Sequence, residues 1–247
     1  MYRRNFIFLG LFIALSSCST FYQPTSLQHS QYKIDTSIRS DSSVKEMLQP
    51  YATNINATMN KVIGMSADTY TNKRPESEIG NFLADCYKEM AEKKFGRKID
   101  AAFMNVGGIR SYLSKGNITV GKIFEIMPFD NLLVLQELKG TVLQQYLDVM
   151  AADGGWPVSK GVSLQIKNKK AANVMVNGKP LDPNATYTVA HSDYVANGGS
   201  DCSMLKSIPQ MNLGYLMRDA ILEYVNIQAS VGKTIQPVIE NRVTNAD

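Results

Sequence analysis

NVGGIR, residues 105–110, follows an apolar run, Ile99–Met104, that is typical of a buried strand. The two glycines, Gly107 and Gly108, allow the backbone to turn and to approach a ligand closely. Arg110 leaves this turn, and its planar guanidinium offers a fork of donors to a phosphate, a carboxylate or a ribose. The stretch therefore predicts a strand that ends in a ligand-binding turn.

Two later stretches place an aromatic residue beside a turn. PFDN, residues 128–131, contains Phe129, and YVANGG, residues 194–199, begins with Tyr194 after a predicted strand. Two aromatic rings can stack a flat ring between them. Together with Arg110, these rings suggest that the ligand is a nucleotide.

The motifs N-x-G-G-I-R, P-F-x-N and an aromatic residue before A-N-G-G together resemble the carboxy-terminal domain of the bacterial and animal 5'-nucleotidases. The resemblance covers residues 61–244. In that family this domain binds the nucleoside part of the substrate, and a separate amino-terminal metallophosphoesterase domain holds two metal ions and performs the chemistry.

The resemblance assigns ligand contacts to five residues of these motifs. Asn105 and Arg110 are expected to hold ribose or phosphate oxygens. Phe129 and Tyr194 are expected to sandwich the base, with Asn131 contacting the ligand or the loop around it. Each residue also has a structural alternative, because aromatic residues pack in cores, asparagines cap turns and arginines pair with acids.

Further contacts are carried over from the family by position. Lys73 or Arg74 takes the place of a family arginine, the alternative being solvated charges at a turn. Gly161 is the candidate for a backbone contact. After its second glycine pair the family has Asp-Gly, and the aspartate binds the ribose, whereas this chain has Ser200 and Asp201. Asp201 is expected to serve the ribose from one position later, or Ser200 to make a weaker contact.

The rest of the chain alternates hairpins, single helices and isolated strands. Because this is not a regular βαβ succession, it predicts an α+β fold with a mixed sheet and packed helices, like the 5'-nucleotidase carboxy-terminal domain. Predicted helices cover Asp41 to Met59, Glu78–Lys94, Thr141–Ala152 and Asn212–Ala229, with a short helix or turn at Gly121–Ile126; predicted strands cover Lys61–Ala67, Ile99–Met104, Leu132–Leu138, Gly161–Asn168, Ala172–Val176, Thr186–Ser192 and Arg242–Thr244.

The first 18 residues have the pattern of a processing signal. Two arginines precede an apolar stretch, Phe6–Leu15, that is too short to span a bilayer, and LSSC, residues 15–18, fits a bacterial lipoprotein signal. Cys18 is therefore expected to carry the lipid, the alternative being an ordinary secretory signal with an incidental cysteine. Either signal predicts export, and we expect a lipid-anchored protein of the cell envelope that faces the periplasm.

Domain boundaries follow from these patterns. We expect a signal peptide at residues 1–18, a flexible tether at 19–40, a connecting helix at 41–60 and the 5'-nucleotidase-like domain at 61–247. The formal net charge of +4 comes from scattered basic residues, so no nucleic-acid partner is predicted. Cys86 and Cys202 are predicted to be free thiols, with a disulfide as the alternative.

Residues for metal-dependent catalysis are scarce in this sequence. A metallophosphoesterase needs histidine and carboxylate ligands around its metal ions, and the chain has only two histidines, His29 in the predicted tether and His191 on a strand. A structural role is expected for His191, whose neighbour Ser192 points to the opposite face of the strand. No catalytic residue, metal or cofactor is predicted in this chain, and divalent metals are expected in a partner.

The resemblance and the scarcity of metal ligands together imply the nucleoside-binding half of a split 5'-nucleotidase for nucleotide catabolism. A separate metallophosphoesterase-domain protein would supply hydrolysis, and this chain would be inactive alone. Two alternatives stay open. One is a stand-alone nucleoside-binding lipoprotein of the envelope, and the other is a degenerate domain kept for structure or protein contact.

Overall fold

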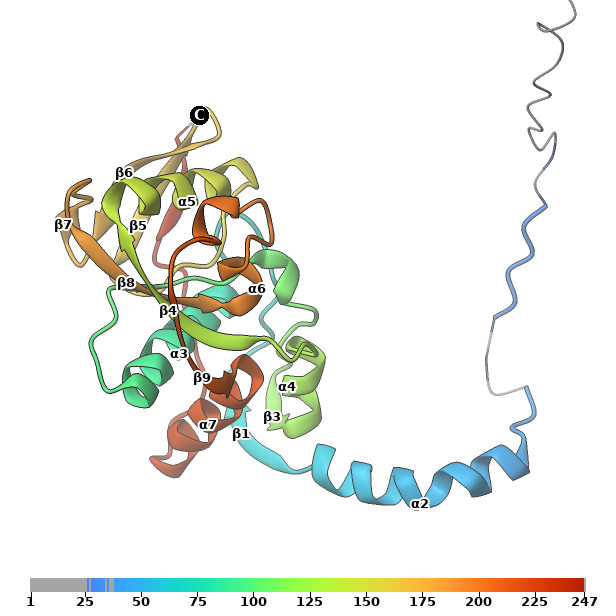
Figure 1. Cartoon of the computed structure of the whole chain (residues 1–247). Coiled ribbons are helices and arrows are strands. Elements are labelled where there is room, and N and C mark those ends of the chain that lie inside the picture. Colours follow the sequence, from blue (N-terminus) through green and yellow to red (C-terminus); the bar gives the residue numbers. More distant parts are fainter. Residues whose placement is uncertain (1–25, 27, 34, 36–37, 247) are drawn as a thin grey trace, which may run out of the picture. The chain divides into compact units, whose positions relative to one another are not determined.

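The computed structural model describes residues 26, 28–33, 35 and 38–246 (Figure 1). The predicted signal peptide, Cys18 and part of the predicted tether lie outside these residues. The chain divides into two units, residues 1–47 and 48–247, and each is considered by itself. In the part of the chain that is described, no helix combines the length and the apolarity needed to cross a membrane.

Helix α2 (Ser42–Met59) confirms the helix predicted after Asp41. The Asp41 carboxylate caps it by accepting hydrogen bonds from the backbone N–H groups of Ser43 at 2.9 Å and Val44 at 3.3 Å. No residue of the helix is buried. Its apolar side chains are therefore not part of a hydrophobic core.

A four-stranded mixed sheet lies at the centre of the second unit. Its order is β2-β8-β4-β9, with β8 parallel to β2 and β4 antiparallel to both of its neighbours. The strands are β2 (Ala101–Ala102), β8 (Thr186–Ser192), β4 (Leu132–Lys139) and β9 (Gln210–Leu216). The mixture of parallel and antiparallel pairing confirms the predicted α+β class with a mixed sheet.

The remaining strands of this unit form two smaller sheets. One has the order β10-β5-β6-β7 and consists of β10 (Val243–Asn245), β5 (Val162–Lys167), β6 (Lys170–Val176) and β7 (Lys179–Pro180). The hairpin β5–β6 was predicted, and β10 pairs with β5 in parallel. The other sheet pairs β1 (Val62–Ser66) with β3 (Gly116–Thr119).

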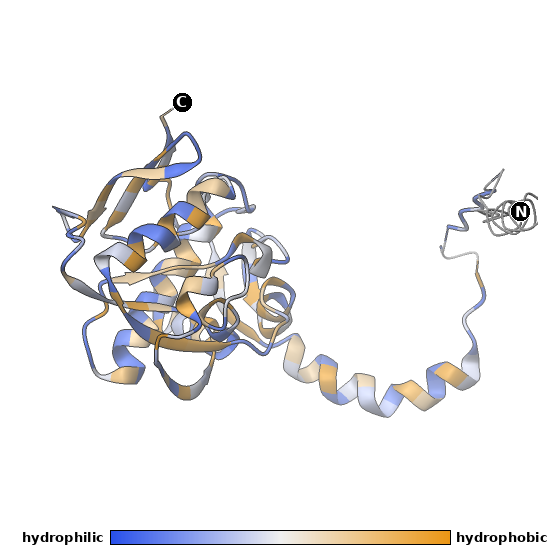
Figure 2. Ribbon diagram, turned by 45° about the horizontal axis from the view of Figure 1, so that its top comes forward, coloured by the Kyte–Doolittle hydropathy of each residue, from blue (hydrophilic) through white to orange (hydrophobic). Residues whose placement is uncertain are grey.

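The helices cover both faces of the central sheet (Figure 1). Leu135 and Ala190 face the hydrophobic core that contains α3 and α7, whereas Leu138 and Val189 face the core that contains α5. The remaining helices are α3 (Glu78–Phe95), α4 (Val120–Ile126), α5 (Gly140–Ala152), α6 (Asp193–Ala196) and α7 (Met217–Ser230), with short 3-10 helices at Val106–Gly108 and Ser203–Leu205. Figure 2 shows hydrophobic residues along these packed helices and strands, and also along the unburied helix α2.

One predicted helix is wrong over its first part. Residues 210–216 form β9, and the helix begins only at Met217. The strand pairs with β4, so its backbone groups are satisfied in the sheet. Asn212 and Gly214 are poor helix formers, and Gly214 adopts a positive φ of 67°. The helical periodicity of Met217–Ser230 was thus extended too far toward the amino end.

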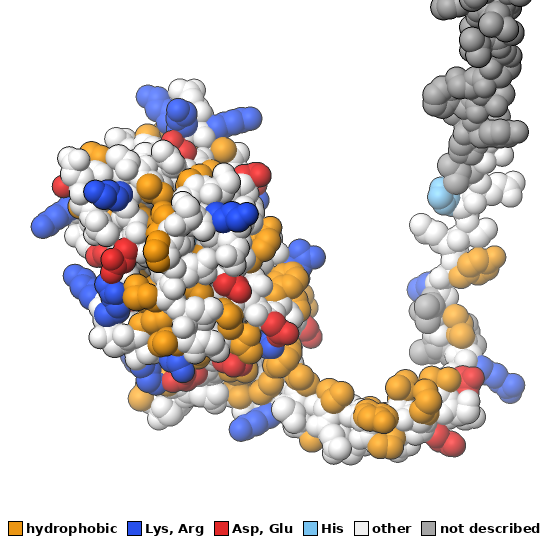
Figure 3. Space-filling view, in the orientation of Figure 1, with side chains coloured by type: hydrophobic (Ala, Val, Ile, Leu, Met, Phe, Trp, Pro, Cys, Tyr) orange, Lys and Arg blue, Asp and Glu red, His pale blue; other side chains and the backbone are white. Residues whose placement is uncertain are grey.

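The surface charges agree with the scattered basic residues of the sequence. On the face shown in Figure 3, lysine and arginine side chains alternate with acidic, polar and hydrophobic ones instead of gathering into one basic patch. This face offers no broad positive surface of the kind that nucleic-acid binding needs.

Candidate functional site

A cavity of about 420 Å³ lies at one edge of the central sheet. Its lining brings together residues from all three sequence motifs. The lining residues are Asn105, Gly107, Gly108, Phe129, Asn131, Tyr194 and Ser200. We call this cavity the aromatic pocket.

Strand direction explains why distant motifs meet there. β2 and β8 are parallel, so the turn after β2 and the residues after β8 leave the sheet at the same edge. β4 runs antiparallel to β8, so the loop that precedes β4 reaches that edge too. The NVGGIR, PFDN and YVANGG stretches are therefore neighbours in space although they lie far apart in the sequence.

The turn after β2 is formed by the two glycines. A 3-10 helix spans Val106–Gly108 and is closed by a 2.9 Å hydrogen bond from the Gly108 N–H to the Asn105 carbonyl. A Cβ at Gly108 would overlap Cε of Met104 and would lie 3.1 Å from Oδ1 of Asn105. Glycine at this position therefore lets the backbone turn and pack closely against Met104 and Asn105.

Asn105 is almost fully buried, with 9% of its surface exposed, and its Oδ1 has no hydrogen-bond partner within the described part of the chain. A buried acceptor without a partner costs free energy. Because Asn105 lines the aromatic pocket, a donor group of a ligand is a suitable partner for this oxygen.

Arg110 lies at the margin of the pocket and is exposed. Its Nη1 donates to the Gly107 carbonyl at 3.3 Å, and its guanidinium carbon lies 5.9 Å from the centroid of the Phe129 ring. The two side chains are thus within cation–π range of each other. The structure brings Arg110 beside the pocket, although it is not one of the lining residues.

Phe129 and Tyr194 are the two aromatic walls. They are 41% and 47% exposed, so neither ring is part of a hydrophobic core. The Tyr194 ring lies over Gly199, where a Cβ would overlap the ring carbons, and the Tyr194 hydroxyl accepts a 3.3 Å hydrogen bond from the Ser200 N–H. The glycine pair after α6 therefore sets the position of this ring.

Asp193 connects the two walls and was not predicted as a site residue. Its Oδ1 accepts hydrogen bonds from the N–H of Leu132 at 3.0 Å and the N–H of Tyr194 at 2.9 Å. It thereby joins the start of β4, directly after Asn131, to the helix that carries Tyr194. The available sequence signal was the pair Ser192-Asp193 at a strand end, which is typical of a helix cap.

Asp201 lies outside the lining of the aromatic pocket. It lines a neighbouring cavity of about 410 Å³ together with Asp153, Trp156 and Ser200. Ser200, which contributes to both cavities, and Asp201 adopt positive φ angles of 53° and 62°. Of the two ribose candidates, Ser200 is therefore the one at the aromatic pocket.

Arg74 and Gly161 also lie outside that lining. Arg74 forms a 2.8 Å ion pair with Asp153, whose Oδ2 also accepts a 2.6 Å hydrogen bond from Nε1 of Trp156. Gly161 precedes β5, and a Cβ there would lie 2.9 Å from Oδ1 of Asn177. Arg74 thus contacts Asp153, which lines the neighbouring cavity, and Gly161 packs against the turn after β6.

Trp156 and His191 are both buried within the fold. Trp156 is 2% exposed and packs edge to face against Tyr146, so it is part of a hydrophobic core. His191 is fully buried with Nδ1 3.3 Å from the Tyr146 hydroxyl, and burial lowers its pKa to about 3. This histidine is therefore neutral at physiological pH.

Reactive thiols and metal ligands are not features of the site. Cys86 and Cys202 are buried and free, as predicted, and burial raises the pKa of Cys202 to about 12. Among the residues that the structure describes, no three His, Cys, Asp or Glu side chains come together in a group that could hold a metal ion. These residues do not fit the two-metal centre of a phosphoesterase.

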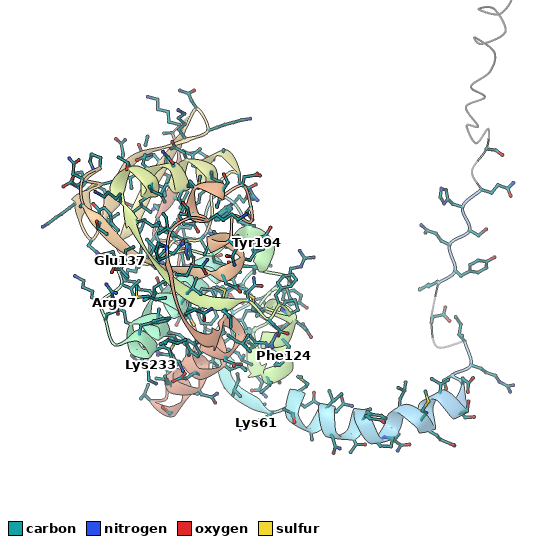
Figure 4. All side chains as sticks on the ribbon, viewed as in Figure 1. Lys61, Arg97, Phe124, Glu137, Tyr194 and Lys233 are labelled. Atoms are coloured by element: carbon teal, nitrogen blue, oxygen red, sulfur yellow. The ribbon has the colours of Figure 1, made fainter. Side chains whose placement is uncertain are left out.

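The chemistry of the pocket is that of a binding site. Two exposed aromatic faces suit a flat ring, and the two asparagine amides and the Ser200 hydroxyl offer hydrogen bonds to neutral polar groups. Arg110 adds a positive charge at the margin. Figure 4 labels Tyr194, one of the two aromatic walls, and Phe124, a residue of α4. The two residues lie on the same side of the ribbon, and the loop after α4 carries Phe129, the other wall.

Comparison with known proteins agrees with this architecture. A 5'-nucleotidase from Vibrio vulnificus is 27% identical over 202 residues, which are 78% of this chain and 35% of that protein. Protein UshA of Yersinia enterocolitica is 28% identical over 198 residues, 76% of this chain and 35% of that protein. This chain thus spans about a third of the length of these curated relatives.

A solved structure and a family description match as well. The crystal structure of a 5'-nucleotidase precursor from Thermus thermophilus has a TM-score of 0.70 and 27% identity, covering 82% of this chain and 43% of that one. Residues 52–207 match the family described as 5'-nucleotidase, C-terminal domain. Because this match covers more than half of the sequence, the chain belongs to the 5'-nucleotidase C-terminal domain family.

Proposed function

We propose that this chain binds the nucleoside part of a nucleotide in the aromatic pocket and is the substrate-binding half of a 5'-nucleotidase. The observation that carries the proposal is the pairing of two exposed rings, Phe129 and Tyr194, in one cavity with the unpartnered oxygen of Asn105. Aromatic rings that remain exposed cost hydration free energy, which a stacked base would remove.

Each wall has a defined part in this proposal. The base stacks between Phe129 and Tyr194, while Oδ1 of Asn105 accepts a hydrogen bond from an N–H or O–H group of the nucleoside. Arg110 pairs with ribose or phosphate oxygens at the pocket margin. The chain holds and orients the nucleoside, and orientation lowers the barrier to a reaction at the attached phosphate.

Hydrolysis is assigned in this proposal to a metallophosphoesterase-domain protein on another chain, which holds the divalent metals. Support comes from the described residues, which bring together no set of metal ligands. On this proposal the purified chain does not hydrolyse AMP alone, and it accelerates AMP hydrolysis when mixed with its partner.

Calorimetric titration of adenosine and AMP into the full chain, purified in detergent, tests the binding step. Saturable binding is expected, with affinity reduced roughly tenfold or more by Phe129→Ala or Arg110→Ala. Lys233→Ala is the matched control, since Lys233 lies beyond the end of α7 and not in the lining of the pocket. Absence of saturable binding, or equal losses in all three variants, would remove the basis of the proposal.

A stand-alone nucleoside-binding protein of the envelope is the second candidate function. Its basis is the same pocket, in which Phe129, Tyr194 and Asn105 are placed to hold a nucleoside. Mixing this chain with a metallophosphoesterase-domain protein and measuring AMP hydrolysis distinguishes the stand-alone role from the role as half of a 5'-nucleotidase. If the chain binds adenosine but no metallophosphoesterase-domain protein of the same organism gains AMP hydrolysis from it, the stand-alone role stands.

The place of the protein in the cell is a further part of the proposal. The LSSC stretch before residue 19 supports a lipid on Cys18 and an envelope position facing the periplasm. A Cys18→Ala variant is expected to lose the lipid and to leave the membrane fraction. Retention of this variant in washed membranes would contradict the lipid anchor.

A further inference from the structure

Arg218, in the first turn of α7, lies behind the loop that carries Phe129. Only 10% of its side chain is exposed. The loop joins α4 to β4, and the antiparallel pairing of β9 with β4 places the start of α7 at the same sheet edge as the aromatic pocket. A buried cation thus faces a loop that contributes two lining residues, Phe129 and Asn131.

The guanidinium contacts three consecutive residues of this loop. Nη1 donates to the carbonyl oxygens of Pro128 and Phe129, both at 3.3 Å, and Nη2 forms a 2.7 Å ion pair with Oδ1 of Asp130. The guanidinium carbon also lies 4.2 Å from the centroid of the Phe124 ring. Since Phe129 follows Pro128 directly, these contacts fix the peptide groups on both sides of the Phe129 Cα.

Other bonds fix the ends of the loop. The Arg110 N–H donates to the Ile126 carbonyl at 2.9 Å, and the Met217 N–H donates to the Asn131 carbonyl at 2.9 Å. Between these two points Met127 is buried, whereas residues 128–130 are exposed, and the Asp130 side chain is 81% exposed. Arg218 therefore supplies the buried anchor for the exposed middle of the loop.

This arrangement has an energetic cost. Nε of Arg218 is buried and has no hydrogen-bond partner among the described residues. A buried donor without a partner destabilises the fold, and an apolar side chain of similar size would avoid that cost. The contacts that Arg218 makes to the Phe129 loop offset the cost of its unpartnered Nε.

We propose that Arg218 is a positioning residue, which holds the Phe129 ring at the wall of the aromatic pocket before a ligand arrives. A ring fixed in advance loses less conformational entropy when the ligand binds. The ligand itself rests on the proposed function, whereas the order of the ring is a property of the free protein and can be measured without a ligand.

The first test is fluorine NMR of the free full chain labelled with 4-fluorophenylalanine. The Phe129 resonance is assigned as the one that Phe129→Leu removes. In Arg218→Lys and Arg218→Met we expect it to move toward the position of the free amino acid, because the ring is no longer held. An unchanged Phe129 resonance in both variants would overturn the proposal.

Arg242→Lys is the matched control for the loss of a buried arginine. The Arg242 side chain is 6% exposed and pairs with Asp85 and Glu240, and it lines a different cavity. It is expected to lower stability without moving the Phe129 resonance. If the Arg218 variants do not fold, Asp130→Ala removes the shortest contact from an exposed position. A smaller shift in the same direction is then expected, and no shift would count against the proposal.

Adenosine titration gives the second test. Arg218→Lys is expected to weaken binding roughly tenfold in the otherwise unchanged chain and to have no further effect in a Phe129→Ala background, because the two residues act through one ring. An equal loss in both backgrounds would show that Arg218 does not act through Phe129. If the unchanged chain binds no adenosine, the proposed function fails, while the NMR result still decides the role of Arg218.

Discussion

At the scale of single residues, the pocket depends on the space left by a missing side chain. Gly199 does not have a positive φ, so its backbone conformation is open to other residues. A Cβ there would nevertheless overlap the Tyr194 ring. Glycine at this position leaves room for the ring above it. The motif A-N-G-G in the sequence therefore indicates that an aromatic ring lies over its second glycine.

Gly199→Ala is expected to affect binding more than stability. The ring of Tyr194 is half exposed and can swing away from the new methyl group, so the free energy of unfolding should fall by less than about 1 kcal/mol. Adenosine affinity should fall roughly tenfold, since the wall has moved. In a Tyr194→Leu background the same substitution should leave affinity unchanged. A large loss of stability in a urea titration would contradict this account.

His191 gives a second prediction, for the dependence of stability on pH. Burial lowers its pKa from 6.5 to about 3. Between these values the unfolded chain binds a proton that the folded protein excludes, so stability falls as the pH decreases from 6.5 toward 3. The slope from this residue is at most about 1.4 kcal/mol per pH unit.

Urea titrations of the unchanged chain and of His191→Gln at about pH 7 and about pH 5 measure this contribution. Other groups that titrate in this range contribute to both proteins and cancel in the comparison. The unchanged chain should lose more stability than His191→Gln on acidification. Equal losses would show that His191 can be protonated within the fold.

At the scale of elements, the strands and helices with a clear local pattern were predictable, whereas β9 was not. α3 and α5 carry continuous apolar faces, and they appear within one residue of the predicted bounds. β9 was missed because its stability comes from pairing with β4, a long-range contact that local pattern does not reveal. The position of Arg218 behind the Phe129 loop follows from the pairing of β9 with β4. It was therefore not predicted either.

Asp193 provides a prediction at this scale, since its carboxylate joins β4 to α6. Asp193→Ala leaves the N–H groups of Leu132 and Tyr194 without their partner, and the free energy of unfolding should fall by about 1–3 kcal/mol. Asp193→Asn keeps an acceptor oxygen at the same place and is the control. Urea titration should show a clear loss for alanine and a small one for asparagine; equal losses would mean that the negative charge matters rather than the two bonds.

At the scale of the whole molecule, the direction of the strands decides which motifs meet. The ends of β2 and β8, the start of β4 and the end of β9 share one edge of the central sheet. Sequence motifs identified Asn105, Phe129, Asn131 and Tyr194, which do meet there. They could not show that Asp201 belongs to the neighbouring cavity or that Gly161 lies by the β5–β6 hairpin, because loop conformation decides both positions.

This geometry predicts where a nucleoside protects the backbone from hydrogen exchange. Adenosine should slow exchange in three separate segments, residues 105–110, 128–132 and 193–200, because all three lie at the aromatic pocket. The β5–β6 hairpin, Val162–Val176, belongs to another sheet and should exchange at the same rate with and without adenosine. Mass spectrometry of peptides from the full chain measures all four regions in one experiment. Protection that includes the residues around Gly161 would extend the site across to the hairpin, whereas protection of the hairpin alone would place the ligand elsewhere and refute the pocket as its binding site.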